Sequence, residues 1–544
     1  MADRVYLFGD VDEIKEFVFE TSSLPQVRGG SRLLQDCEAE IRSRYGDGVV
    51  YCAGGTFLLK VPAVSAETVK AELERLYRER TLSATVTIVW EEGSPVEPGP
   101  AGQLLDRWAG RLQRAAAGHD DSFGLRMAAL AARMREAKTM PRSAPFFEAW
   151  PFGRRCQRCG KRMAVSREPV EDARWLCLVC QHRDRAGRGG RERIYGQDVR
   201  GRFNQCFWHR YGQEFSAQQP EDLGSLVAGA RRDYLAFLYA DGNDIGRLLQ
   251  RARNEGQYKA ISDALTEATR DALYDALKET CGAALRDQEY WPFDIVNVGG
   301  DDVIVLAQAG YAWDLAVRFL KGFEEKVNGR LSGVLGGPLP GKVTASCGIA
   351  IADARYPLRY LERLATSVLK TAKDLAKAEP TSSSALSFLW LPTPVAVDTA
   401  EALLSGYRLV TIGKSSVTLA ARPYTLEQAS RLSELVREVV LWPRGLRQRW
   451  AEALLAGVMP STALIAYDIA RQNPARQGRL QRTIRGLADL IGRDGVGSSL
   501  EPPVWASIDA GGGQPTWKTA LFDALELAEL YSTRPDAPAE EDEQ

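Results

Sequence analysis

The feature that most constrains this chain is an acidic hairpin in its middle. Residues 295–306 read IVNVGGDDVIVL, so two apolar β-type runs flank a Gly299-Gly300 step that is followed at once by Asp301 and Asp302. Such runs around a tight turn are typical of a buried β-hairpin. The glycines carry no Cβ, so a ligand can approach the turn closely. Adjacent carboxylates at a tip suit Mg²⁺, which prefers oxygen ligands.

A second strand also ends in an acid. Residues 234–240 read YLAFLYA and run straight into Asp241, 60 residues before Asp301. Two strands that end in acids can converge on one pair of divalent ions, which is the layout of a palm-type nucleotidyl transferase. Asp241 and Asp301 would share the ions and Asp302 would complete the shell. The alternative is that these acids merely end two strands.

Nucleotide joining sets a specific chemical requirement on such a site. A 3′-hydroxyl must attack an α-phosphate while pyrophosphate leaves, and two Mg²⁺ or Mn²⁺ ions about 3.5–4 Å apart assist both oxygens. The Gly242 carbonyl is a further candidate ligand, and Asp244 is expected to cap the next helix or to touch metal. Lys373 either reaches a triphosphate or is an ordinary exposed helix lysine.

The order of expected elements indicates an α+β fold with two ferredoxin-like palm domains. The first 90 residues read as βαββαβ, with a helix that is expected to start at Gly29-Gly30-Ser31 and to run toward Arg44. The same order recurs from about Asp233. We interpret this recurrence as an internal duplication, against the alternative of two unrelated units.

The two expected hairpins differ in their acids. GGTF at 54–57 aligns with GGDD at 299–302, so Thr56 and Phe57 stand in place of the acids and a metal pair is not expected in the first half. The segment Arg28-Gly29-Gly30-Ser31 is either a phosphate cradle of backbone N–H groups at a helix start or an ordinary turn and N-cap.

Four cysteines have the spacing of a structural zinc site. Cys156 and Cys159 form one C-x-x-C pair, Cys177 and Cys180 form a second, and 17 residues separate the pairs. Four thiolates around a tetrahedral Zn²⁺ leave no open position, so the expected role is structural.

Composition excludes several classes of protein. Hydrophobic residues make up 45% of the chain, no apolar run reaches about 18 residues and no leader is evident, which favours a soluble cytoplasmic protein. An HD phosphohydrolase is excluded, because His119-Asp120 has no further histidine ligands nearby and the chain has three histidines in all. From Pro151 to Phe203, fourteen Lys and Arg stand against six Asp and Glu; this belt is either a partner surface or a solubilising one.

The expected domains follow from these patterns. They are a degenerate first palm (1–92), a helical linker with the zinc module (103–230, with the zinc module at 156–180), a second palm with the GGDD hairpin (231–394), a helical C-terminal domain (395–534) and an acidic tail (535–544).

Taken together, these parts resemble the large polymerase subunit of type III CRISPR effector complexes. The resemblance is carried by GDVD at 9–12, RGGS at 28–31, the Cys₄ module, DGN at 241–243 and the GGDD hairpin, in that order. The second palm is also similar to GGDEF-type cyclases, because the strand VTASCG at 343–348 precedes a helix with Ala372-Lys373.

The resemblance implies condensation of ATP into cyclic oligoadenylates, in antiviral defence and with other effector subunits and guide or target RNA. It places the donor triphosphate at the GGDD metals and the acceptor ATP near Gly30 and Ser31. The N-terminal HD nuclease of many members is expected to be absent. A non-catalytic scaffold subunit and a GTP-using cyclic dinucleotide synthase remain alternatives. The expected nucleotide contacts are Gly30, Ser31, Gly242, Asn243, Gly299, Gly300 and Lys373.

Overall fold

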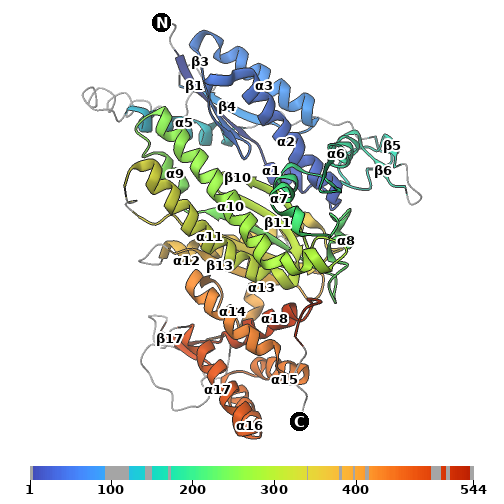
Figure 1. Cartoon of the computed structure of the whole chain (residues 1–544), viewed down its shortest axis with the longest axis vertical. Coiled ribbons are helices and arrows are strands. Elements are labelled where there is room, and N and C mark those ends of the chain that lie inside the picture. The colour runs from blue at the N-terminus through green and yellow to red at the C-terminus, as the bar shows by residue number, and fades with distance from the viewer. Residues whose placement is uncertain are drawn as a thin grey trace.

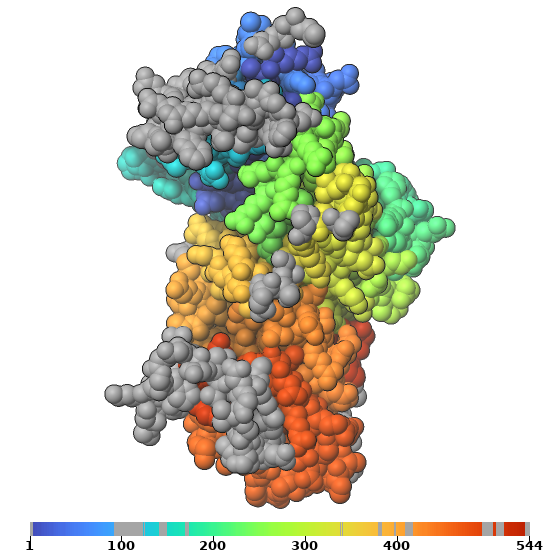
Figure 2. Space-filling model, turned by 90° about the vertical axis from the view of Figure 1, so that its left-hand side faces the viewer, coloured from blue at the N-terminus to red at the C-terminus, as the bar shows by residue number. Residues whose placement is uncertain are grey.

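The structure is a computed structural model, and its elements are drawn in Figure 1. It describes residues 4–91, 122–140, 150–168, 173–337, 339, 341–378, 383–395, 399–410, 416–491, 504–509 and 515–538. The expected linker (92–102), much of the stretch toward the zinc module and the acidic residues 539–544 lie outside these ranges. Along the long axis the first palm stands at one end, the second palm in the middle and the C-terminal region at the other end (Figures 1 and 2).

The first palm has the predicted strand and helix order. Its sheet runs β2-β3-β1-β4, with β1 antiparallel to both β3 and β4. The elements are β1 (Arg4–Val11), α1 (Ile14–Val18), α2 (Leu24–Tyr45), β2 (Val49–Ala53), β3 (Thr56–Pro62), α3 (Ala66–Thr81) and β4 (Val86–Trp90).

The predicted helix start at Gly29 is wrong. Helix α2 begins at Leu24, with Pro25 in its first turn, so Gly29, Gly30 and Ser31 lie inside the helix. Their N–H groups are therefore part of a regular helix and are not a phosphate cradle. Gly29 instead lets helix α6 (Leu178–Arg188) approach, because a Cβ there would lie 1.9 Å from the Arg183 carbonyl oxygen.

The second palm repeats this plan within a larger sheet. Its sheet runs β10-β11-β9-β12-β13-β16, of which only β12 and β13 are parallel neighbours. The elements are β9 (Tyr234–Gly242), α9 (Ile245–Leu249), α10 (Glu255–Asp287), β10 (Phe293–Gly299), β11 (Asp302–Gln308), α11 (Ala309–Leu335), β12 (Ala345–Asp353), α12 (Leu358–Ala378), β13 (Ala385–Trp390) and β16 (Tyr424–Thr425).

The registers of the two hairpins correct the predicted alignment by one residue. Each first strand carries a bulge at the same place, between Val49 and Tyr51 and between Ile295 and Asn297. Counting from these bulges sets the turn Gly54-Gly55 against Gly300-Asp301. Gly55 and Thr56, rather than Thr56 and Phe57, therefore occupy the positions of Asp301 and Asp302.

The duplication extends beyond the hairpins. Asp10 pairs with Thr87 as Asp241 pairs with Ser346, so the two positions are equivalent. Three residues later, Glu13 and Asp244 each precede a short helix in the same left-handed conformation, with φ of 48° and 55°. A positive backbone φ of this kind is uncommon outside glycine. Their recurrence at equivalent positions favours duplication over two unrelated units.

Of the segment between the palms, the helix Ser122–Thr139 packs against one face of the first palm's sheet, and the cysteine-bearing part forms a small module on the other side, beside α2 (Figure 1). Its helix α6 packs along α2. The elements of this region are α5 (Ser122–Thr139), β5 (Ser166–Arg167), β6 (Trp175–Leu176), α6, β7 (Glu192–Ile194), β8 (Gln197–Val199), α7 (Arg202–Tyr211) and α8 (Leu223–Val227).

The C-terminal region is helical, as predicted, but also holds a four-stranded sheet, β14-β15-β18-β17, that the sequence did not reveal. Its strands are three or four residues long, too short for a clear alternation. The elements are α13 (Ala400–Leu404), β14 (Arg408–Val410), β15 (Ser416–Thr418), α14 (Leu426–Val440), α15 (Arg444–Leu455), α16 (Val458–Ala470), α17 (Pro474–Asp489), β17 (Ala506–Asp509), β18 (Pro515–Lys518) and α18 (Leu521–Tyr531).

The second palm's sheet separates two hydrophobic cores. Alternate β9 residues face opposite ways, so Leu238 and Ala240 belong to the core with α10 and α11, whereas Phe237 and Tyr239 belong to the core shared with α12 and the first palm. The first palm packs on the second of these faces, and it also reaches α10, where the Tyr6 hydroxyl donates to Glu255 Oε2 at 2.9 Å. The side chains of β9 that lie on the same face as Tyr239 therefore point toward the first palm.

Candidate active site between the two palms

The pairing of β9 with β11 brings the predicted acids together. Ala240 pairs with Val303, which places Asp241 beside Asp302 at the ends of adjacent strands. Asp301 packs on the next residue of β9, because a Cβ at Gly242 would lie 2.7 Å from the Asp301 Oδ2 atom. The three aspartates thus come from two strand ends and share one corner of the sheet.

The three carboxylates are neighbours, but their oxygen atoms do not all lie within 4.8 Å of one another. Across the described ranges, the only group of three or more His, Cys, Asp or Glu residues with ligand atoms all within 4.8 Å consists of cysteines. The Asp241 carboxylate forms an ion pair with Lys373 of α12. A divalent ion on Asp241 would therefore have to displace this ammonium group.

The electrostatics of Asp301 and Asp302 fit a cation site. Burial and the neighbouring Asp302 charge raise the pKa of Asp301 to about 7. Burial also raises the pKa of Asp302 to about 6, although the nearby Lys15 acts in the opposite direction. Two adjacent carboxylates that resist ionisation are stabilised by a hard cation, which supplies the missing positive charge.

Two lysines from different domains flank these acids. Burial lowers the pKa of Lys373 to about 8. Lys15 comes from α1 of the first palm and places its ammonium 3.7 Å from the centre of the Tyr239 ring. The Tyr239 hydroxyl donates to Asp302 Oδ1 at 3.4 Å. The local sequence around Lys15 did not predict its place in this site, because its partners are hundreds of residues away in the chain.

Asn243 has a structural task in this arrangement. Its Nδ2 donates to Thr344 Oγ1 at 2.9 Å, and its Oδ1 accepts from Ser346 Oγ at 3.0 Å. At the equivalent place in the first palm, Asp12 accepts from the hydroxyls of Thr85 and Thr87. These bonds fix the strand end that carries Asp241. Asp244 occupies the N-cap position of α9, but its side chain makes no capping bond.

The predicted hairpin glycines serve the contact between the two palms. A Cβ at Gly299 would lie 2.6 Å from the Cα of Gly54, so the two hairpin turns touch through their backbones. Gly300 has a φ of 64°, which glycine adopts without strain. Both residues shape the corner in which Asp301 and Asp302 stand. Their predicted contact with a nucleotide remains a prediction.

Gly30 and Ser31 lie in α2 of the first palm, near its contact with the second palm. Ser31 Oγ donates to the Val296 carbonyl oxygen at 2.7 Å, and Gly30 packs near Val18. Ser31 also lines a cavity of about 190 Å³ whose walls come from both palms. Further lining residues include Lys15, Gln35, Glu38, Gly54 and Asn297.

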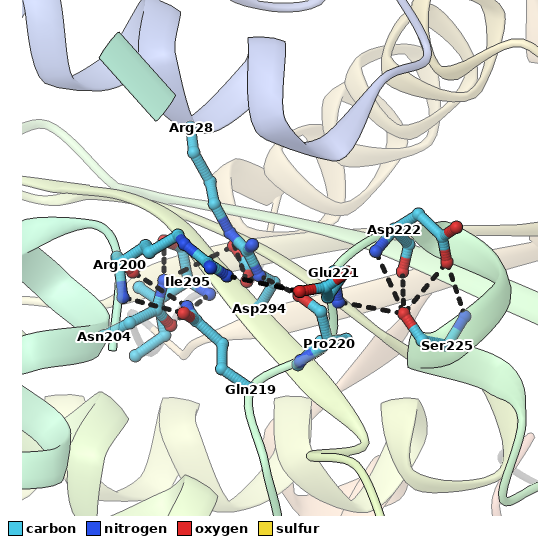
Figure 3. A network of polar contacts seen from close by, with 10 residues as sticks. All are labelled: Arg28, Arg200, Asn204, Gln219, Pro220, Glu221, Asp222, Ser225, Asp294 and Ile295. Atoms are coloured by element: carbon cyan, nitrogen blue, oxygen red, sulfur yellow. Dashed lines mark hydrogen bonds and ion pairs between the residues drawn. The ribbon is translucent and has the colours of Figure 1, made fainter. Parts of the chain in front are cut away.

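Arg28 joins the palms through a buried ion pair (Figure 3). Its Nε donates to Asp294 Oδ2 at 2.9 Å and its Nη2 donates to the Pro220 carbonyl oxygen at 2.8 Å. Arg28 is 4% exposed and Asp294 is fully buried. Asn204 of α7 also contacts Asp294 and bonds the backbone of Ile295. The basic residue of the RGGS segment is therefore a structural anchor.

The four predicted cysteines form one buried cluster. Their sulfur atoms all lie within 4.8 Å of one another, and Cys159 and Cys177 are 3.8 Å apart. Zn–S bonds of about 2.3 Å in a tetrahedron require sulfur atoms about 3.8 Å apart, so the donor set and spacing fit Zn²⁺. The Cys180 N–H donates to Cys177 Sγ at 3.4 Å, as expected of a thiolate knuckle.

Comparison with known proteins supports the palm assignment. Residues 234–380 match the family described as Cas10/Cmr2, second palm domain. No curated protein sequence matches the chain. No helix in the described part of the chain has the length and apolar character needed to span a bilayer.

The chain is similar to several solved structures, one of which has a TM-score above 0.5. A Csm1–Csm4 cassette in complex with AMPPNP has a TM-score of 0.51 at 15% identity, covering 97% of this chain and 70% of that chain. A cassette in complex with cA4 has a TM-score of 0.47 at 16% identity with the same coverage. A Csm1–Csm4 subcomplex of the type III-A CRISPR-Csm interference complex has a TM-score of 0.45 at 16% identity, again covering 97% and 70%. The predicted resemblance to the large polymerase subunit is confirmed by the family match of the second palm and by this shared fold.

Proposed function

We propose that the protein joins ATP into cyclic oligoadenylates at the second palm, as part of type III CRISPR antiviral defence. One observation carries the proposal: Asp241, Asp301 and Asp302 share one corner of the sheet, at the surface where the two palms meet. The match of residues 234–380 to a Cas10/Cmr2 palm supports it. So does the AMPPNP in the complex of the Csm1–Csm4 cassette, since AMPPNP is an ATP analogue.

The chemistry of the corner suits nucleotidyl transfer. Asp241, Asp301 and Asp302 would hold two Mg²⁺ or Mn²⁺ ions, which polarise the attacking and leaving oxygens when bound. The 3′-oxygen of one ATP forms a bond to the α-phosphorus of another and loses its proton, and the bond to pyrophosphate breaks. If Asp241 held a metal ion, its ion-pair partner Lys373 would be released, and the Lys373 ammonium could stabilise the triphosphate charge.

The remaining assignments belong to the same proposal. Zn²⁺ on Cys156, Cys159, Cys177 and Cys180 has a structural role beside the first palm. Gly30, Ser31, Gly242, Asn243, Gly299 and Gly300 form the walls near the two ATP molecules, and the predicted domain boundaries are retained. The Csm1–Csm4 pairing in the similar structure suggests a Csm4-like subunit as a protein partner, with guide and target RNA reached through the complex.

A product assay tests the proposal. The protein is incubated with ATP and Mn²⁺ or Mg²⁺, alone and with a target-bound guide complex, and products are identified by mass spectrometry. We expect adenylate rings and pyrophosphate. Asp301→Ala combined with Asp302→Ala should lower the rate at least about 1000-fold, equivalent to roughly 4 kcal/mol of transition-state stabilisation.

The matched control is Asp10→Asn, at the position of the first palm equivalent to Asp241, which should retain activity. The absence of adenylate product in every condition would favour the scaffold interpretation. Preference for GTP over ATP in a competition assay would favour a GGDEF-like synthase.

A further inference from the structure

Lys15 is a residue of one palm that faces the acids of the other. It lies on the short helix α1 of the first palm, and its ammonium is 3.7 Å from the centre of the Tyr239 ring in β9. Tyr239 in turn bonds Asp302. The Lys15 charge is close enough to Asp302 to oppose the rise in the pKa of that carboxyl.

The other charged groups around Lys15 come from α12. Glu362 Oε1 lies 4.0 Å from the Lys15 Nζ atom, and the side chains are 10% and 32% exposed respectively. Lys373 is near enough for the charge of Lys15 to contribute to its lowered pKa, after burial and Lys377. Two ammonium groups, one from each palm, therefore stand over the corner that holds the aspartates.

The duplication shows that this lysine is specific to the first palm. Since Asp10 is equivalent to Asp241, Lys15 is equivalent to Gly246, which has no side chain to reach across. The palm with the acidic hairpin lacks the crossing lysine, and the palm with the lysine lacks the hairpin acids. The two halves supply complementary parts of one site.

Helix α1 and the residues just after it are held in place by contacts with the cysteine module. Glu20 lies just beyond its end and accepts a hydrogen bond from Arg162 Nη1 at 2.8 Å; it also forms an ion pair with Arg183 Nη1 at 3.2 Å. The Arg183 guanidinium lies 4.0 Å from the centre of the Phe17 ring. Both arginines belong to the cysteine module, so this module braces the helix that carries Lys15.

We propose that Lys15 is a phosphate-positioning residue that the first palm contributes to the nucleotide on the second palm; this rests on the function proposed above. Divalent ions bound to Asp302 and Asp301 would repel its ammonium, while the triphosphate that arrives with them offers oxygen acceptors. A lysine on a flexible stem with three N–H donors can shift from one partner to the other over a short distance. The competing explanation is structural, namely neutralisation of Asp302 and Glu362.

The test compares three variants of the full-length protein in its complex. Lys15→Met keeps the apolar stem and removes the charge, Lys15→Arg keeps the charge, and Lys60→Met is the control. Lys60 is also a first-palm lysine that crosses to the second palm, but its ion pair, at 2.6 Å, is with Glu255 of α10, and its ring contact is with Tyr6. The readouts are the dissociation constant of a non-hydrolysable ATP analogue with Mn²⁺, the KM and kcat for ATP, and the unfolding temperature.

We expect Lys15→Met to weaken analogue binding and raise KM by about 10- to 100-fold, the size of one lost charge-assisted hydrogen bond. Lys15→Arg should recover most of this loss, and Lys60→Met should leave both constants within about 2-fold of the wild type, because surface ion pairs contribute little. A Lys15→Met protein with a changed unfolding temperature but unchanged analogue binding and KM would overturn the proposal. If the wild type binds the analogue but makes no product, the function proposed above fails while the binding comparison still decides the role of Lys15.

Discussion

The two palms have the same framework and different chemistry. Each has the strand order of a ferredoxin-like sheet, the same bulge in its hairpin and a residue held by two hydroxyl groups after its first strand. They differ at the hairpin turn, where Gly55 and Thr56 replace Asp301 and Asp302. Gly55 has a φ of 80°, and a Cβ there would lie 2.2 Å from Ile14 Cδ1. An acid at this position would be strained, so the first turn is built for packing.

The first palm instead supports the second. Arg28 anchors the strand β10 that leads into the acidic hairpin, Gly54 touches Gly299, and Lys15 reaches the acids. A degenerate copy therefore retains a function in the site of its partner. The comparison predicts that damage to these contacts harms the whole site even though the aspartates are untouched.

The largest effect on stability should come from breaking the buried ion pair. Arg28→Met leaves the Asp294 carboxylate fully buried without its cation, which typically costs about 3–5 kcal/mol. We expect a reduced free energy of unfolding, measured by denaturant titration with circular dichroism. The unfolding transition should become less cooperative for both palms.

A double variant controls for the burial of charge. Arg28→Met with Asp294→Leu removes both partners, and apolar replacement of a complete buried pair is often close to neutral. Most of the stability should therefore return. If the single variant is as stable as the wild type, the anchor between the palms has no energetic importance.

Two adjacent glycines offer a smaller and sharper test. Gly29→Ala places a Cβ against the Arg183 backbone of α6, and overpacking of this kind costs about 1–3 kcal/mol. Gly30→Ala meets nothing closer than 3.4 Å, at the Val18 Cα, and alanine in a helix interior gains roughly 0.5–1 kcal/mol over glycine. The unfolding temperatures should move in opposite directions. Equal shifts would show that α2 and α6 are not in close contact.

The sequence predicted what local patterns encode. The cysteine pairs, the two βαββαβ units and the convergence of Asp241 with Asp301 and Asp302 follow from spacing, alternation and the end of each strand. It failed at Gly29, where glycine usually signals a turn, because the reason for that residue is a helix from another module. The pairing of Arg28 with Asp294 and of Lys15 with Tyr239 was equally hidden, because such contacts depend on how the palms face each other.

The one-residue error in the hairpin alignment has a similar cause. Residue identity favoured the alignment of Gly54-Gly55 with Gly299-Gly300, whereas the strand register aligns Gly54 with Gly300. The sequence did not predict the short strands β14, β15, β17 and β18, because each depends on pairing with another strand of the C-terminal region. Strand pairing decides both features, and a single sequence carries no direct record of it.

The smallest predicted effect concerns pH and distinguishes the acidic corner from its counterpart. Carboxyls with a pKa of about 7 in Asp301 and about 6 in Asp302, against roughly 3.9 when unfolded, bind more protons in the folded protein. Their contribution to stability therefore falls as pH rises from about 4 to about 7. Bound Mn²⁺ needs the ionised form, so it should stabilise the protein by about 1 kcal/mol more near pH 8 than near pH 5. Thermal unfolding with and without Mn²⁺ at both pH values measures the difference, which should vanish in the Asp301→Asn, Asp302→Asn protein and persist in Asp10→Asn.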